Sequence, residues 1–158
     1  MEINKHSLIN RLRTVFSSVK QPKTASDGCP RKICREIERR FGNKTREKLN
    51  KDDILFMSAE LTLLNENAFH YFLPAILETA LDDIKSVSFD HLVQNLFSYP
   101  KEHGHKKFQD KRLKLFSTAQ SDVILNIIEW WIKNEDIGET WREGLVKSLP
   151  FWRKRAKR

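Results

Sequence analysis

Apolar residues recur along most of the chain with the three-to-four-residue spacing of amphipathic helices. The first segment places six of them on one helical stripe: Leu8, Ile9, Leu12, Val15, Phe16 and Val19. No segment of useful length alternates apolar and polar residues as a half-buried strand does. The pattern therefore predicts an all-α protein, a single compact domain of six or seven helices around one core.

Caps, glycines and prolines set the expected ends of these helices. The second helix should begin near Ser26 or Asp27, hold Pro30 in its first turn and end at Gly42. Residues 52–61 should form a short helix or an irregular connection. The remaining expected helices cover residues 66–83, 89–98, 118–133 and 139–149. Residues 100–112 are expected to be a polar loop.

Two prolines affect the expected helices differently. Pro74 lies within the apolar stripe of residues 66–83, so the central helix should be kinked there. Pro150 should stop the last helix. We therefore expect a helical domain over residues 1–150 and a basic C-terminal tail over residues 151–158.

Charge is distributed unevenly along the chain. The formal net charge is +8, in alternating blocks: +9 over 1–51, −7 over 52–99, +4 over 100–114, −4 over 115–141 and +6 over 142–158. Such blocks can be solvated faces of neighbouring helices that complement one another within the domain. They can also form a basic surface for an acidic partner.

Two basic segments are candidate binding surfaces, the exposed face of residues 31–48 and the tail. Cations beside aromatic side chains can contact phosphates and stack on bases, or hold a tail on anionic lipid. Alternatively, the tail is a frayed, solubilising end whose aromatic residues pin it to the core. The candidate partner-binding residues are Arg35, Arg39, Arg40, Trp152, Arg153, Lys154, Arg155, Lys157 and Arg158.

Cysteines and histidines raise the question of a metal or a nucleophile. Cys29 and Cys34 could join His103 and His105 around zinc, but a surface loop explains the histidine pair better. We expect a reduced cysteine pair, with Cys34 inert on the apolar stripe of its helix. Cys29, beside Pro30, could be a reactive thiolate. No metal site and no cofactor is predicted.

Catalytic signatures are missing from the sequence. It has no glycine-rich phosphate loop, no G-x-S-x-G, no H-E-x-x-H and no C-x-x-C. The acidic pairs at 52–53, 82–83 and 135–136 fit solvated helix ends. We therefore expect a protein that is not an enzyme.

The hydrophobic runs also bear on location. The most apolar ones, 68–77 and 123–132, are shorter than the roughly 20 residues of a membrane span. The first residues have no apolar signal core. These features predict a cytoplasmic protein without a membrane span.

Three segments carry a resemblance to a known family. Residues 64–81 read LNENAFHYFLPAILETAL, which resembles the LSPEAFRYYLPAFLLAAL signature of a small bacterial family of unknown function. Residues 41–45 (FGNKT) resemble its Gly-Lys turn, and residues 115–120 (LFSTAQ) with 127–131 (IIEWW) resemble its closing helix. The resemblance covers residues 29–134. It implies a helical fold and a bacterial origin and assigns no activity.

The function hypotheses follow from these observations. The first is a protein–protein interaction module of adaptor, antitoxin or immunity type, because segregated charge suits steered association with an oppositely charged partner. The alternative is a nucleic-acid-binding protein that uses the 31–48 face and the tail. A third possibility is an enzyme or metal protein built on Cys29, Cys34 and the histidines.

Overall fold

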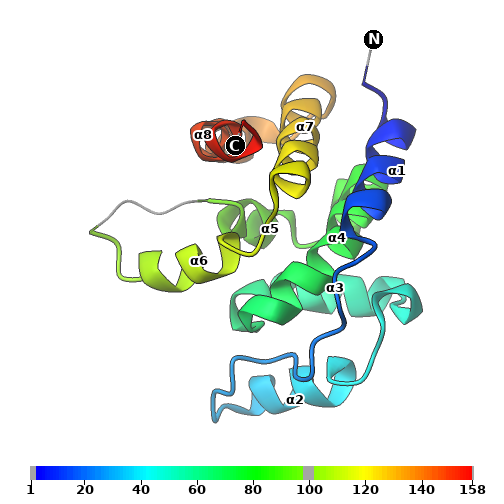
Figure 1. Ribbon diagram of the computed structural model, residues 1–158, viewed down its shortest axis with the longest axis vertical. Coiled ribbons are helices and arrows are strands. Elements are labelled where there is room, and N and C mark those ends of the chain that lie inside the picture. The colour runs from blue at the N-terminus through cyan, green and yellow to red at the C-terminus, as the bar shows by residue number, and fades with distance from the viewer. Residues whose placement is uncertain (1–2, 98–101, 158) are drawn as a thin grey trace. The chain divides into compact units, whose positions relative to one another are not determined.

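A computed structural model describes residues 3–97 and 102–157 of the 158-residue chain. Within these residues the protein is helical, with one isolated bridge between Ser26 and Leu64 and no strand. The α-helices are α1 (Lys5–Phe16), α2 (Lys32–Phe41), α3 (Lys51–Ala59), α4 (Glu66–Asp82), α5 (Phe89–Asn95), α6 (Lys106–Leu113), α7 (Thr118–Asn134) and α8 (Gly138–Ala156). The all-α prediction is confirmed. The predicted number of helices is wrong, because the described residues hold eight α-helices, drawn in Figure 1.

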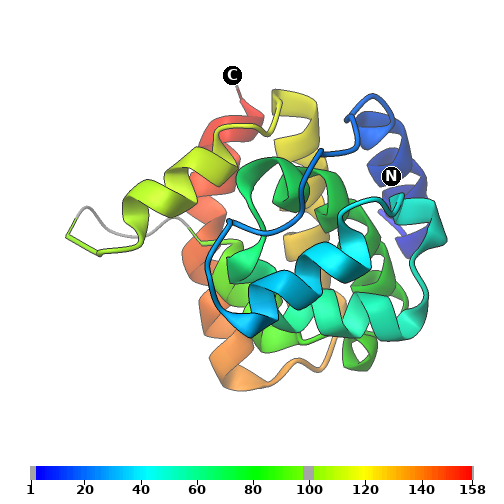
Figure 2. The ribbon, with the colours of Figure 1, turned by 90° about the horizontal axis from the view of Figure 1, so that it is seen from below.

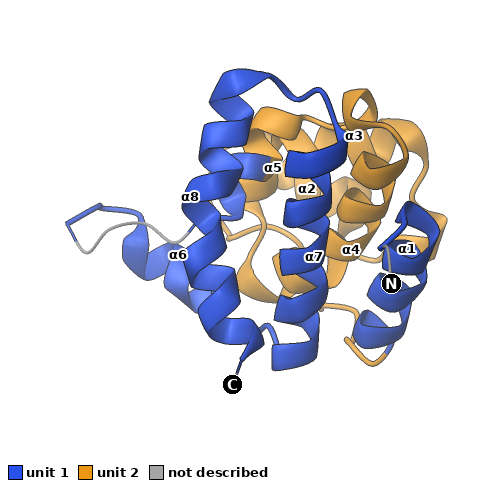
Figure 3. Ribbon diagram, turned by 90° about the horizontal axis from the view of Figure 1, so that it is seen from above, with its two compact units in different colours: residues 1–17, 93–158 blue, residues 18–92 orange. Residues whose placement is uncertain are grey.

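The chain divides into two compact units, coloured separately in Figure 3. Unit 1 contains residues 1–17 and 93–158, and unit 2 contains residues 18–92. The expected single domain over residues 1–150 stays a prediction. None of the helices in the described residues is long and apolar enough to cross a membrane.

Unit 1 is organised around α7, which lies between α1 and α8 (Figures 1 and 3). The predicted capping box is confirmed at its start, where Ser117 and Gln120 each bond the backbone of the other. The side chain of Gln120 also donates to the carbonyl of Val15, 3.1 Å away, and so ties α1 to α7. Phe116 contacts both Phe16 and Trp152 edge to face, with ring centroids 6.0 and 5.8 Å apart.

Helix α8 continues past the point where we expected it to stop. Pro150 is exposed within the helix, which ends at Ala156 rather than at Leu149. A proline inside a helix costs about 3 kcal/mol. That cost is offset by Trp152, which is fully buried and donates its indole N–H to the carbonyl of Leu96 at 2.9 Å. Residues 151–156 are therefore helix rather than tail.

Helix α6 lies in the segment that we expected to be a loop. Its inner face buries Gln109, Arg112 and Leu113, so two of the three inward residues are polar. The amide of Gln109 donates to the carbonyls of Asn95 and Phe97 at 2.6 and 3.0 Å. A helix held by buried polar groups has no apolar stripe, which is why its hydrophobic pattern did not reveal it.

Unit 2 packs around α4, against α3 and the short 3₁₀ helices η1 (Arg46–Lys48) and η3 (Ile84–Ser86). Asn65 caps α4 as expected, because its side chain accepts the N–H of Ala68 at 2.8 Å. The helix runs on through the buried Pro74, and the predicted kink stays a prediction.

Helix α2 begins at Lys32, later than predicted, because the chain before it is held extended. The N–H groups of Ala25 and Ser26 both donate to one carboxylate oxygen of Glu38 at 2.7 Å. The side chain of Asn65 donates to the carbonyls of Thr24 and Ser26. Figure 2 shows this extended segment leading into α2.

Candidate functional site

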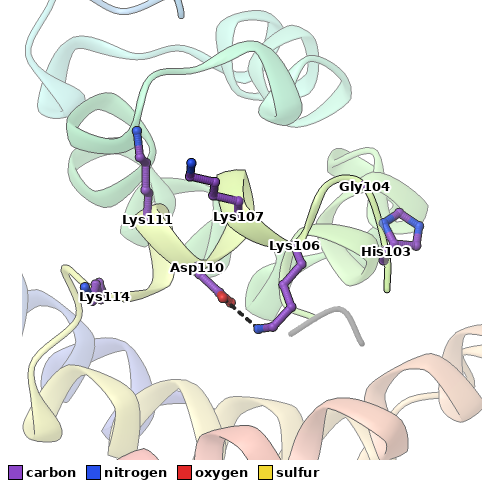
Figure 4. A pocket seen from close by; sticks show the side chains of 7 residues that line it. All are labelled: His103, Gly104, Lys106, Lys107, Asp110, Lys111 and Lys114. Atoms are coloured by element: carbon purple, nitrogen blue, oxygen red, sulfur yellow. Dashed lines mark hydrogen bonds and ion pairs between the residues drawn. The ribbon is translucent and has the colours of Figure 1, made fainter. Parts of the chain in front are cut away.

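A hollow of about 540 Å³ lies on the outer side of α6 in unit 1. It is lined by His103, Gly104, Lys106, Lys107, Asp110, Lys111 and Lys114. Figure 4 shows Lys107 and Lys111 extending to the same side of the helix, whereas Lys106 turns towards Asp110. The ammonium of Lys106 lies 2.6 Å from the Asp110 carboxylate, so these two charges compensate each other.

Three further lysines of this hollow, Lys107, Lys111 and Lys114, are exposed; we call them the lysine cluster. Within the described part of the chain, none of them is in an ion pair at 4 Å or less. Lys107 and Lys111, four residues apart, extend to the same side of α6, and Lys114 follows at its C-terminal end. A like-charge pair at the spacing of Lys107 and Lys111 costs about 0.2–0.5 kcal/mol. The cluster therefore presents a local positive potential that an anionic partner would relieve.

The opposite face of α6 fixes the helix that carries the cluster. Arg112 is completely buried, and its guanidinium donates to the side-chain oxygen of Asn95 at 2.7 Å. The same guanidinium lies over the ring of Phe108, 5.0 Å from its centre. Together with Gln109, this contact sets which side of α6 faces solvent.

Leu115 follows the lysine cluster directly and is 38% exposed. The other large apolar side chains exposed in the described residues are also aliphatic: Ile3, Leu55 and Val146. Over residues 3–97 and 102–157, no Phe, Tyr or Trp side chain reaches that class of exposure, whereas His103 and His105 beside the hollow do. The surface next to the cluster can thus contact an apolar side chain through Leu115, and its exposed aromatic rings are the imidazoles of His103 and His105, whose centres lie 5.5 Å apart.

The basic residues that we predicted on α2 are largely engaged within unit 2. Arg35 donates to the carbonyl of Pro30 at 2.7 Å, and Arg39 forms two hydrogen bonds to Glu36. Arg40 is half-buried against the ring of Phe56, with its guanidinium 4.3 Å from the ring centre. Only Arg35 and Arg39 of this set are exposed.

Arg40 also belongs to an ion-pair cluster around Asp53, whose side chain is 6% exposed. Its carboxylate lies 3.2 Å from the Arg40 guanidinium and 2.7 Å from the Lys44 ammonium. It also accepts the N–H of Asn50 in the cap of α3. Burial raises the pKa of Asp53, but the hydrogen bonds from Lys44, Asn50 and Arg40, with the Lys44 charge, outweigh burial and lower it.

The lowered pKa of Asp53 makes stability depend on pH. Because the folded pKa lies below the unfolded value of about 3.9, its contribution is present above that value and is lost as the pH falls through the folded pKa. We expect Asp53→Asn to cost about 1–3 kcal/mol at pH 7. Urea unfolding at pH 7 and pH 3 measures the effect, and the difference between the two proteins should be smaller at the lower pH. An equal difference at both pH values would contradict the ion-pair account.

The predicted tail residues have different environments along the end of α8. Trp152 is buried and serves the core of unit 1. Arg153 pairs with Glu129 at 2.9 Å, and half-buried Arg155 donates to the carbonyl of Phe116 at 2.5 Å. Lys154 and Lys157 are exposed. Arg158 lies outside the described residues.

The cysteines do not form the reduced pair that we expected. Cys29 and Cys34 are joined by a disulfide, with their Cα atoms 5.9 Å apart. They lie in unit 2, whereas His103 and His105 lie in unit 1. Asp27 is the carboxylate near the cysteines, and the three ligand atoms lie within 4.8 Å of one another. The expectation of a reduced cysteine pair was wrong, because sequence spacing alone does not reveal the tight turn at Gly28, whose φ is +81°.

Sequence reasoning did not select the lysine cluster. The spacing of Lys107, Lys111 and Lys114 was a usable signal, since it places like charges on one helical face. This spacing indicates a shared face only within a helix, and residues 100–112 were expected to be a loop.

A comparison with known families agrees with the resemblance noted in the sequence. A model described as "Family of unknown function (DUF6714)" matches residues 4–156. Neither the curated proteins nor the solved structures contain a match to the chain. The resemblance to a family of unknown function is confirmed, and the match extends it over nearly all of the sequence.

Proposed function

We propose that this chain, which belongs to the family of unknown function DUF6714, is a non-enzymatic protein-binding module of adaptor, antitoxin or immunity type. Its lysine cluster on α6 would hold an acidic segment of the partner protein. The observation that carries the proposal is the hollow of about 540 Å³ flanked by three exposed lysines. Complementary charge of this kind speeds association and selects the partner.

The partner's chemistry follows from what surrounds the cluster. Three ammonium groups require carboxylates at matching spacing. Leu115 adds an apolar contact at one end. An acidic amphipathic helix with one apolar side chain every one or two turns offers both features. Such a partner would bury Leu115 while pairing the lysines.

Nucleic acid is the alternative partner, and the structure supports it less well. Arg39, Arg40 and Arg153 pair with carboxylates, which lowers the positive potential of the α2 face and the α8 end. Arg35 and Arg155 bond to backbone carbonyls, which hold these side chains but leave their charge. The two exposed lysines of the α8 end are Lys154 and Lys157. Binding of DNA through them would weaken steeply with salt, as phosphate contacts release counterions.

Charge reversal separates these two functions. The variant K107E/K111E/K114E should bind a synthetic acidic amphipathic peptide about 10- to 100-fold more weakly than wild type, because each exposed ion pair contributes up to about 1 kcal/mol. Isothermal titration calorimetry with the peptide, and fluorescence anisotropy with a labelled DNA duplex, measure the two affinities.

Matched variants control for the change in net charge. K20E/K133E/K147E alters three exposed lysines elsewhere and changes the net charge equally, so it should bind the peptide within about threefold of wild type, through long-range screening alone. K154E/K157E should likewise leave peptide binding intact. If K107E/K111E/K114E retains peptide affinity while K154E/K157E loses DNA affinity, the proposed function is wrong and the nucleic-acid alternative holds.

A further inference from the structure

A small disulfide ring in unit 2 closes the turn that leads into α2. It joins Cys29 to Cys34, five residues apart in sequence, across Pro30 and the first turn of the helix. The two cysteines differ in accessibility, because Cys34 is 1% exposed whereas Cys29 is partly exposed. Because reactivity follows access, we expect an external thiol to attack Cys29 rather than Cys34.

The surroundings of the ring are cationic. Arg31, Lys32 and Arg35 are all exposed. The guanidinium of Arg35 is held beside the ring by its hydrogen bond to the carbonyl of Pro30 at 2.7 Å. The first turn of α2 contains no acidic residue, and no side chain caps its N-terminus. Positive charges and a helix N-terminus both stabilise a thiolate, here that of Cys34 in the first turn.

Asp27 places a carboxylate at the buried sulfur. Its Oδ1 atom lies 3.6 Å from Sγ of Cys34 and also accepts the backbone N–H of Cys29 at 3.0 Å. Gly28 allows the turn between them, with a φ of +81° that a side chain would strain. When the ring is open, this carboxylate is positioned to accept the proton of the Cys34 thiol.

The segment before the ring is fastened independently of it. Ala25 and Ser26 bond to Glu38, and the N–H of Asp27 donates to the carbonyl of Leu63 at 2.9 Å. Opening the disulfide thus leaves Asp27 in its place beside α2. The pair can open and close without refolding of the unit.

From these features we propose that Cys29 and Cys34 form a thiol–disulfide exchange site for small anionic thiols of the glutathione class. In the oxidising direction, the Cys29 thiolate attacks a sulfur of the small-molecule disulfide; its S–S bond breaks, one small thiolate leaves and a mixed disulfide forms. Cys34 gives its proton to Asp27 and attacks the sulfur of Cys29, which expels the second small thiolate. Asp27 passes this proton to the departing thiolate, and the first thiolate takes from solvent the proton that Cys29 lost on ionisation. The protein loses two electrons and two protons, and the small-molecule disulfide becomes two thiols.

Reduction follows the same path backwards. A glutathione-class thiolate attacks Cys29, Cys34 leaves as the thiolate, and a second small thiol releases Cys29. The cations Arg31, Lys32 and Arg35 favour this anionic class of thiol over neutral ones. The inference does not depend on the binding function of α6, since the two sites lie in different units.

The test is a redox titration of the full chain in glutathione buffers, with free thiols trapped by an alkylating agent and counted by mass spectrometry. Wild type should pass reversibly between two free thiols and none. Cys34→Ser should accumulate a mixed disulfide with glutathione at Cys29. Cys29→Ser should react at least about tenfold more slowly, because Cys34 is buried. A wild-type protein that keeps both thiols under oxidising conditions would overturn the proposal.

Two further measurements test the role of Asp27 as proton acceptor and distinguish the exchange site from a metal site. Asp27→Asn should slow closure of the ring from the mixed disulfide by about tenfold or more and change its pH–rate profile, while leaving the first step unchanged. Reduced wild type is also titrated with zinc, because Asp27 and the two thiols lie close enough to share an ion. Stoichiometric zinc that blocks both thiols from oxidation until it is chelated would overturn the exchange site in favour of a metal site.

Discussion

Trp152→Ala is expected to lower the free energy of unfolding by about 3–5 kcal/mol, the usual cost of removing a buried tryptophan side chain. Trp152 has no exposed surface, contacts Phe116 edge to face, and donates its indole N–H to the carbonyl of Leu96. The substitution leaves a cavity and an unsatisfied carbonyl at one point in unit 1. Urea unfolding followed by circular dichroism measures the loss.

Two variants show which part of Trp152 matters. Trp152→Phe keeps most of the buried ring and loses the hydrogen bond, so it should cost about 1–3 kcal/mol. K154A/K157A changes exposed neighbours and should stay within about 0.5 kcal/mol of wild type. If Trp152→Ala were as mild as K154A/K157A, the end of α8 would be a frayed tail after all.

Arg112→Ala should cost about 2–4 kcal/mol, because a hydrogen bond to a charged group contributes about 1.5–3 kcal/mol and the lost side chain leaves a cavity. The guanidinium is completely buried and bonds to Asn95 at 2.7 Å. Without it, α6 loses the contact that fixes its inner face. Hydrogen exchange of the α6 amides should increase together with the loss of global stability.

Arg112→Met is the informative comparison. A buried ionic group can often be replaced by an apolar one of similar volume at little cost. The methionine variant should therefore recover part of the stability but still lose the hydrogen bond from Arg112 to the side-chain oxygen of Asn95. Arg112→Ala with unchanged exchange in α6 would mean that Gln109 alone holds the helix.

The parts of the fold that sequence reasoning predicted well are those with local signals. The capping box at Ser117 and the apolar stripe that follows placed the start of α7 correctly. Asn65 did the same for α4. Both helices bury continuous apolar faces, so periodicity and capping agree.

The errors share a physical cause, which is tertiary contact overriding local preference. Pro150 should have ended α8, but burial of Trp152 carries the helix past it. Helix α6 has a polar inner face and so gave no hydrophobic pattern. The late start of α2 depends on Glu38 and Asn65, which hold the preceding chain from positions remote in sequence.

The sequence predicted that the candidate site would be a basic surface, but not which basic segment forms it. Residues 100–114 carry a net charge of +4, and the alternating charge blocks led us to expect a basic surface for an acidic partner. Which basic segment is available to a partner depends on which cations already pair with carboxylates, and only the side-chain geometry shows that. Arg39 and Arg153 each lie within 3 Å of a carboxylate. Lys107 and Lys111 instead line the hollow beside α6.

The most direct test of the proposed binding surface is a nuclear magnetic resonance titration of the isotope-labelled protein with the acidic amphipathic peptide. The account predicts that amide shifts concentrate in α6 and at Leu115, saturate at one peptide per protein, and disappear in K107E/K111E/K114E. Shifts concentrated in α2 and at the end of α8, and produced by a DNA duplex rather than by the peptide, would contradict it.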